Sequence, residues 1–217
     1  MIKRLTEKLF LKKRYVLQGF SDQLIKPFNE AVVEQYYDFF IVSRLRDLKG
    51  FTQYQESITH SFSKGIERRI YSGNWCLFLL FDKRTKQVAA KYWAFFSKET
   101  NLWHDNFIIT KNSALLCNAY VDKSHRGNGL YKYLINKSHQ YLFDIKAHNA
   151  FTIVEASNIA SLQANISSGL HIVLCNNLFK FFTINILATY KQNNHTKLAM
   201  LGPVLGKRVL YKTSNLF

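Results

Sequence analysis

The segment Tyr120-Val-Asp-Lys-Ser-His-Arg-Gly-Asn-Gly-Leu-Tyr131 carries an Arg-Gly-x-Gly turn and is the most informative part of the chain. An apolar run over 114–121 leads into the turn, and a helical pattern begins directly behind it. Such a junction binds phosphate, because backbone N–H groups and the positive end of the helix dipole face the turn. Gly127 and Gly129 allow a ligand to approach the backbone closely, and Arg126 can add charge-assisted hydrogen bonds. The stretch therefore predicts a site for a phosphorylated ligand.

The composition is typical of a folded chain with a strongly basic surface. The 217 residues suit one domain over 1–217, and 47% hydrophobic residues are enough for a full core. The 30 Lys and Arg residues outnumber the 14 Asp and Glu residues, and the net charge of +16 favours anionic partners. Nucleotides, nucleic acid and an acidic membrane surface all fit this charge, which does not distinguish them.

Cysteine usage and hydropathy indicate the expected compartment. Cys76, Cys117 and Cys175 are odd in number and lie in apolar segments, which predicts reduced core thiols and neither disulfides nor a metal site. The most apolar stretch, 172–190, is interrupted by asparagines and a lysine, so it is not expected to span a membrane. The N-terminus lacks the apolar run of a secretion signal. We therefore expect a cytoplasmic protein.

The order of expected elements is that of an α/β protein with a mixed sheet. Periodicity, turn residues and caps define these elements. In chain order they are a basic helix within residues 1–14, a strand at 14–20, helices at 30–48 and 55–71, a hairpin of strands at 75–81 and 88–95, a strand at 114–121, a helix from the turn to about 145, a strand at 151–154, a helix from Asn158 to Ser168, and C-terminal strands within 171–217.

Two motifs in the middle of the chain carry a resemblance to a known family. The first, Arg126-Gly-Asn-Gly-Leu-Tyr131, matches the pattern Arg/Gln-x-x-Gly-x-Gly/Ala. The second begins at Asn158 and ends at Gly169-Leu170, and it matches an Asn…Tyr…Gly-Phe pattern on the helix after the fifth strand. Together they resemble the GNAT superfamily of acyl-coenzyme A-dependent N-acyltransferases over roughly residues 113–171. The resemblance implies an α/β fold with a mixed, mostly antiparallel sheet, splayed strands four and five, and flanking helices.

The resemblance also implies acetyl-CoA as co-substrate. The amides of residues 126–131 would bind its pyrophosphate, and the backbone of 119–121 would pair with its pantetheine arm. A backbone N–H there would polarise the thioester carbonyl, and a deprotonated acceptor amine would attack directly. The implied coenzyme-binding residues are Ala119, Tyr120, Val121, Arg126, Gly127, Asn128, Gly129, Leu130, Tyr131, Asn158 and Ser161.

Two residues depart from the family pattern. Tyr131 stands where a small residue is usual, so its ring must point away from the pyrophosphate or the turn must shift. Asn165 stands where a tyrosine usually protonates the departing thiolate, and an amide can hydrogen-bond sulfur but is a poor proton donor. Asn158 and Ser161 share the helix face of Asn165. They fit coenzyme contacts and a helix cap with its hydrogen-bond partner equally well, and they can be both. Coenzyme binding is therefore predicted, while the proton path stays open.

Candidates for acid–base chemistry are few. Glu155 ends the fifth strand and can relay a proton through water, although a solvated strand-end carboxylate is the slightly favoured alternative. His104 and Asp105 precede the fourth strand on the expected acceptor side. Cys117 alternates with polar neighbours and is more typical of core than of a nucleophile. We take Glu155 and Asn165 as the candidate catalytic residues.

The acceptor is predicted as a primary amine, with an amino sugar or another small amine first. Aromatic side chains in the first expected helices suit a sugar face, and they are equally ordinary core. One alternative is an amine carried on nucleic acid, such as an aminoacyl-tRNA, or on protein. Another is a non-catalytic module that binds coenzyme A or nucleic acid. The aromatic residues in question are Tyr36, Tyr37, Phe39 and Phe40.

Overall fold

The structure is a computed structural model that describes residues 9–19, 29–44, 46–47, 65–96, 102–104, 107–109, 111–145, 147, 149–181, 184–191, 199–200 and 211–212. Its elements, in chain order, are β1 (Leu9–Gly19), α2 (Glu30–Tyr36), β2 (Tyr37–Val42), α5 (Gly65–Tyr71), β3 (Trp75–Asp82), β4 (Val88–Phe96), β5 (Leu102–His104), β6 (Phe107–Ile109), β7 (Ser113–Val121), the 3₁₀ turn η2 (Lys123–His125), α6 (Leu130–Asp144), β8 (Asn149–Glu155), α7 (Ile159–Ser167), β9 (His171–Phe181), β10 (Ile184–Lys191), β11 (Ala199–Met200) and β12 (Tyr211–Lys212).

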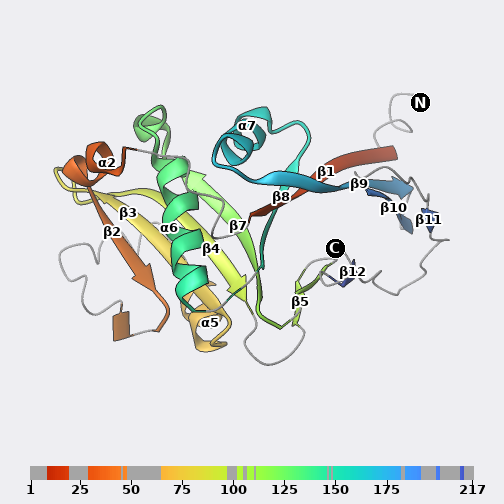
Figure 1. Cartoon of the computed structure of the whole chain (residues 1–217), viewed down its shortest axis with the longest axis horizontal. Helices are drawn as coiled ribbons and strands as arrows, with labels where there is room; N and C mark the ends of the chain where they lie inside the picture. Colours follow the sequence, from red (N-terminus) through yellow and green to blue (C-terminus); the bar gives the residue numbers. More distant parts are fainter. Residues whose placement is uncertain are drawn as a thin grey trace.

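The main sheet has nine described strands in the order β11-β10-β9-β1-β8-β7-β4-β3-β2. All neighbours are antiparallel except β7 and β8, which are parallel. Strands β12, β6 and β5 form a separate small sheet. The mixed, mostly antiparallel sheet with flanking helices is thus confirmed (Figure 1). The place of β1, between β8 and β9, did not follow from the sequence.

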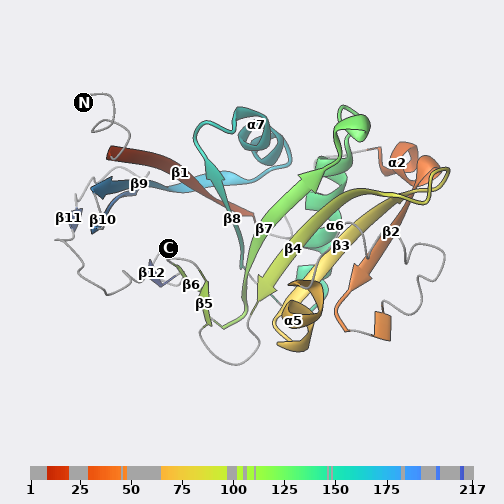
Figure 2. The ribbon, with the colours of Figure 1, turned by 180° about the vertical axis from the view of Figure 1, so that it is seen from behind.

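The centre of the sheet is buried on both faces. Alternate residues of β3 belong to two cores: Phe78 and Leu80 pack with α6, whereas Leu79 packs with Ile66 and Ile70 of α5. Figures 1 and 2 show α6 on one face of β3 and β4 and α5 on the other. A strand covered on both faces reads as a continuous apolar run, which is the pattern of 75–81.

Two expected helices are corrected by the structure. The segment 2–13 was expected to be a basic helix, but Leu9–Gly19 is a strand that pairs with both β8 and β9, and residues 1–8 lie outside the described ranges. The expected helix 30–48 ends at Tyr36, and the chain continues as β2. Backbone pairing explains the difference, because Tyr37–Val42 completes the edge of β3, and tertiary pairing overrides a helical period.

Other expectations agree more closely with the structure. The hairpin strands, the strand before the turn and the helices α6 and α7 are present, with ends within a few residues of those expected. The stretch 172–190 forms most of β9 and β10, and none of the described helices is long and apolar enough to cross a membrane. Of the expected helix 55–71, only Gly65–Tyr71 is described. The cysteines Cys76, Cys117 and Cys175 are free.

A core substitution tests this two-sided packing. Phe78 is 0% exposed, whereas Phe143 of α6 is 55% exposed. Phe78→Ala is expected to lower the free energy of unfolding by about 3–5 kcal/mol, because it removes a ring and leaves a cavity. Phe143→Ala removes the same atoms from the surface and is expected to change it by about 0.5 kcal/mol or less. Urea unfolding measures both, and equal losses would contradict the described core.

Stability should also depend on the protonation of His139. This side chain is buried in α6, and burial lowers its pKa from 6.5 to about 3. Between these values the unfolded chain binds a proton that the folded chain does not, so stability falls as the pH falls. We expect a loss of about 1.4 kcal/mol between pH 7.5 and 5.5 that His139→Gln does not show. Parallel curves of unfolding free energy against pH for the two proteins would refute this.

Candidate functional site

The strands β7 and β8 separate partway along their length. They pair from Ser113 with Asn149 to Leu116 with Thr152, and no further. The burial of β7 changes at the same point, since its first four residues are buried and residues 118–120 are exposed. Figures 1 and 2 show the two strands diverging toward α7 and the turn. The unpaired edge of β7 is thus open to a ligand.

A cavity of about 660 Å³ lies where the strands diverge. Ligand sites for small molecules and cofactors commonly have this size. Every residue of the predicted coenzyme-binding set except Asn128 lines it. Five further residues complete the lining: His125, Lys132, Ala160, Ala164 and Ser167.

The turn at one end of the cavity has the backbone geometry of an anion cradle. Gly127 and Gly129 adopt φ values of 86° and 75°, which favour glycine. A side chain added at Gly127 would meet no atom within 4 Å, so the space in front of the turn is open. Asp122 fixes the entry to the turn, because its carboxylate accepts hydrogen bonds from the backbone and hydroxyl of Ser124. These hydrogen bonds lower the pKa of Asp122 to about 2.

Helix α6 presents backbone donors to the same end. Its first described ladder bond runs from the N–H of Tyr133 to the carbonyl of Gly129. The amides of Leu130, Tyr131 and Lys132 therefore precede the ladder, as in every helix N-terminus, and are oriented for an anion. Arg126 donates from Nε to the carbonyl of Val121 at 3.2 Å, which holds the side chain beside the end of β7.

A β-bulge at Asn118 redirects the end of β7. The register with β4 shifts between Lys91 and Trp93, so that Asn118 and Ala119 together oppose one residue of β4. Asn118 has a φ of 54°, a conformation that asparagine tolerates better than most residues. With its amide oxygen toward Arg69, Asn118 accepts two hydrogen bonds of 3.2 and 3.3 Å from the guanidinium group. This bulge was not predicted, since an asparagine inside an apolar strand was its only signal in the sequence.

The ring of Tyr131 points into the protein and not across the turn. It packs edge to face on Tyr92 with the ring centroids 5.8 Å apart, and its hydroxyl accepts a hydrogen bond of 2.9 Å from Nδ2 of Asn165. Tyr92 in turn donates to Oγ1 of Thr152 at 3.3 Å. The ring thus turns inward onto Tyr92, as in the first of the two arrangements considered for Tyr131. Tyr92 and Thr152 had no signal in the sequence.

Helix α7 forms the opposite wall. The side chain of Asn158 caps it by accepting from the N–H of Ser161 at 3.1 Å, and both residues line the cavity. Asn165 is fully buried and lies behind the wall, where Nδ2 also donates to the carbonyl of Ser161. Gly169, with a φ of 101°, ends the helix as expected.

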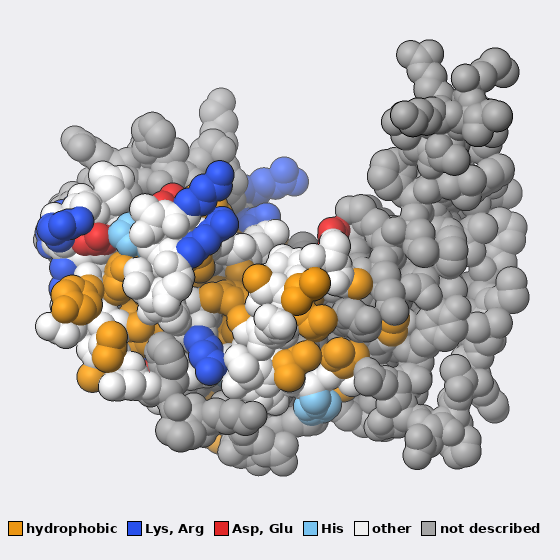
Figure 3. All heavy atoms as spheres, turned by 90° about the horizontal axis from the view of Figure 1, so that it is seen from above, with side chains coloured by type: hydrophobic (Ala, Val, Ile, Leu, Met, Phe, Trp, Pro, Cys, Tyr) orange, Lys and Arg blue, Asp and Glu red, His pale blue; other side chains and the backbone are white. Residues whose placement is uncertain are grey.

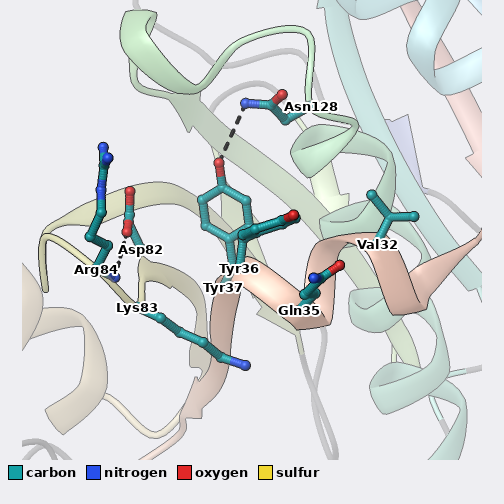
Figure 4. Close-up of a pocket in the computed structure, with 8 residues that line it drawn as sticks. All are labelled: Val32, Gln35, Tyr36, Tyr37, Asp82, Lys83, Arg84 and Asn128. Atoms are coloured by element: carbon teal, nitrogen blue, oxygen red, sulfur yellow. Dashed lines mark hydrogen bonds between the residues drawn. The ribbon is translucent and has the colours of Figure 1, made fainter.

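Asn128 points away from the cavity toward a second depression of about 440 Å³. Its amide donates to the hydroxyl of Tyr37 at 3.4 Å (Figure 4). The same amide also donates to the carbonyl of His125 at 3.2 Å. The Tyr37 hydroxyl also lies 3.1 Å from Nδ1 of His125, which is 3.9 Å from a carboxylate oxygen of Asp82. Asn128 therefore anchors the back of the turn to β2 and β3.

None of the described candidates for acid–base chemistry lines the cavity. Glu155 is exposed at the end of β8 and is not among the residues that line the cavity. Asp105 and the side chain of His104 lie outside the described residues. Burial raises the pKa of Cys117 to about 12, which suits core and not a nucleophile. No group of three or more His, Cys, Asp or Glu side chains in the described part of the chain could hold a metal.

Three of the four aromatic residues expected to wall the acceptor side pack within or against the cores. Phe39 stacks on Phe78, and Phe40 packs on Phe81, because both belong to β2 and not to a helix. Tyr37 is also buried. Tyr36 alone of these four is exposed, at 58%.

Charge and apolar surface separate on the face that holds the cavity. Lys and Arg side chains gather on the side of the turn, and apolar side chains gather over α7, where Ile159 and Ile166 are exposed (Figure 3). Arg126 and Lys132 contribute to the lining from the basic side. The cavity thus joins a cationic end to a more apolar arm.

Comparison with solved structures identifies this arrangement. An acetyltransferase of the GNAT family from Colwellia psychrerythraea superposes with a TM-score of 0.52 at 15% identity, covering 80% of this chain and 57% of that one. A GCN5-related N-acetyltransferase from Sphaerobacter thermophilus gives 0.51 at 13% identity, covering 82% and 55%. The glucosamine N-acetyltransferase region of a fungal multi-domain β-N-acetylglucosaminidase gives 0.57 at 11% identity, covering 82% and 22%.

The chain has the GNAT fold. It spans just over half the length of the two bacterial proteins. No protein-family model matches the sequence, and no similar sequence was found among curated proteins. The likeness thus lies in the structure: a parallel pair inside an antiparallel sheet, a glycine turn and a helix behind it.

The bulge at Asn118 can be tested by two substitutions. Asn118→Val and Asn118→Gly both remove the amide that contacts Arg69. The difference between their free energies of unfolding therefore reports the cost of the positive φ at this position. A β-branched residue at a positive φ is strained, and we expect Asn118→Val to be about 2 kcal/mol less stable than Asn118→Gly. Urea unfolding gives the comparison, and a valine variant as stable as the glycine variant would rule out the bulge.

Proposed function

We propose that this protein is an N-acyltransferase that moves an acetyl group from acetyl-CoA to a primary amine. The observation that carries the proposal is the cavity between the diverging strands β7 and β8, closed at one end by the glycine turn and the N-terminus of α6. An extended arm with a pyrophosphate at one end matches this shape. The open space in front of Gly127 supports the fit.

The residues of the cavity would bind and orient the two substrates. Arg126, Lys132 and the first amides of α6 would hold the pyrophosphate. The exposed edge of β7 at Ala119–Val121 would pair with the pantetheine arm, since unpaired strand edges accept extended partners. When bound, acetyl-CoA supplies an activated acyl group. The protein supplies position, and a backbone N–H of β7 would polarise the thioester carbonyl.

An amino sugar is the first acceptor to test. The glucosamine N-acetyltransferase region of the fungal protein shares this fold, which supports the choice at the level of fold alone. The aromatic side chains no longer support an amino sugar, because Phe39 and Phe40 are half-buried and pack against the two cores. For an acceptor carried on nucleic acid, the net charge of +16 remains the only support, and the basic residues beside the cavity serve a coenzyme phosphate equally well.

Calorimetry with acetyl-CoA tests the site. Arg126→Ala is expected to weaken binding about ten- to one-hundred-fold, because charge-assisted hydrogen bonds are lost. Arg68→Ala removes an exposed arginine of α5, away from the cavity, and should leave binding unchanged. Ala160→Trp places a large ring in the cavity and should abolish binding, whereas Ile159→Trp, one residue earlier on α7, should not.

The reaction is then followed by release of free thiol with glucosamine and a panel of small amines. Turnover with any amine supports the proposed acyltransferase activity. Binding of acetyl-CoA without turnover would instead indicate a module that binds the coenzyme. A folded wild-type protein that does not bind acetyl-CoA would overturn both the site and the activity.

A further inference from the structure

Arg69 of α5 lies against the bulge in β7. Its guanidinium carbon is 4.6 Å from the ring centroid of Trp75 and 4.9 Å from that of Trp93, so two aromatic rings hold the group by cation–π contacts. The same guanidinium donates two hydrogen bonds to the amide oxygen of Asn118. These bonds use two of its five N–H groups, so it can also donate to a ligand. The charge of Arg69 is thus fixed beside the residue that precedes Ala119, which lines the cavity.

Lys91 of β4 adds a second positive charge close to the first. Lys91 pairs with Tyr120 across the two strands, and its Nζ lies 5.5 Å from the centroid of the Tyr120 ring. Tyr120 is 44% exposed and lines the cavity. Burial and the positive charge of Arg69 lower the pKa of Lys91. The two cations are therefore close enough to repel one another, and an anionic group placed between them would offset that repulsion.

The two cations belong to the face of the sheet that α5 partly covers. The rings under Arg69 are part of the core beneath α5. Figure 2 shows α5 over one end of β3 and β4, while no described helix covers the other end of β4 on this face. Arg126 and Lys132, which the proposed function assigns to the coenzyme phosphates, lie at the glycine turn instead. Arg69 and Lys91 are thus cations that coenzyme binding does not use.

We propose that Arg69 and Lys91 bind an anionic group of the acceptor, so that the substrate is an amine that also carries a phosphate or a carboxylate; the inference rests on the proposed function. A planar guanidinium matches two oxygens of either anion, and the ammonium of Lys91 adds a point charge. The contact of Arg69 with Asn118 places the anion near the stretch of β7 along which the thioester would lie. Polycationic amines are repelled from the same surface.

The first test measures binding without turnover. Protein saturated with coenzyme A is titrated with glucosamine 6-phosphate and with glucosamine, which differ only in the phosphate. A second pair, 3-aminopropionate and propylamine, differs in a carboxylate. Wild type is expected to prefer the anionic member of at least one pair about tenfold or more, the effect of charge-assisted hydrogen bonds. Lys91→Gln and Arg69→Gln are expected to reduce that preference to about twofold, whereas Lys91→Arg and Arg69→Lys keep the charge and retain it.

A matched control separates this site from the general charge of the protein. The net charge of +16 attracts any anion weakly, so the comparison between variants decides. Arg68→Gln removes the same charge from an exposed neighbour of Arg69 on α5 and should leave the preference intact. Equal affinity within both pairs in wild type would overturn the anion site. A preference that Lys91→Gln and Arg68→Gln reduce equally would also overturn it.

The second test measures kinetics with acetyl-CoA and the same four amines. Lys91→Gln is expected to lower kcat/KM for the preferred anionic amine about tenfold, mainly through KM, because the lost interaction is made in the ground state as well. Turnover of the neutral amines without any preference for their anionic partners would overturn the anion site and leave the acyltransferase standing. Selective binding of an anionic amine that Lys91→Gln abolishes, without turnover of any amine, would support the anion site and overturn the acyltransferase.

Discussion

The pairing of β7 with β8 stops partway along the strands, and this break determines where the cavity lies. Two parallel strands buried in a sheet normally pair along their whole length, because unpaired N–H and C=O groups are costly. Here pairing stops after Leu116 and Thr152, and the bulge at Asn118 turns the rest of β7 away. An open strand edge in the middle of a sheet invites an extended partner. The sheet thus contains a gap shaped for a chain-like ligand.

The surrounding packing keeps this gap open. Strands β3 and β4 are covered by α6 on one face and α5 on the other, so the half of the sheet that carries β7 is packed on both faces. Helix α6 packs on that half, whereas α7 follows β8 and contacts β9. The cavity walls therefore belong to the two diverging halves of one sheet. The hydrogen bond from Asn165 to Tyr131 joins these halves across the gap.

Sequence reasoning succeeded where local signals and tertiary structure agree. The glycine turn, the cap at Asn158 and the apolar run of β3 each have a local physical cause, and each element was placed to within a few residues. It failed where pairing partners decide. Tyr37–Val42 follows a helical period yet forms a strand on β3. Residues 9–13 were assigned to a basic helix, yet they begin the strand β1, whose later part was predicted as a strand. The pattern of a single strand does not show which strands it will pair with.

Ten of the residues predicted to bind the coenzyme line one cavity. They lie on two short stretches of the chain, and the fold brings these stretches together.

The exchange between Tyr131 and Asn165 shows why single positions mislead when they are read alone. By itself, Tyr131 is too large for the turn, and Asn165 is too weak an acid. In the structure the ring of Tyr131 leaves the phosphate end free, since it turns inward onto Tyr92, and the amide of Asn165 meets its hydroxyl. The two residues that depart from the expected pattern are thus hydrogen-bonded to each other. The contact ties the first turn of α6 to α7, so the two helices that flank the cavity are linked by a partly buried polar pair.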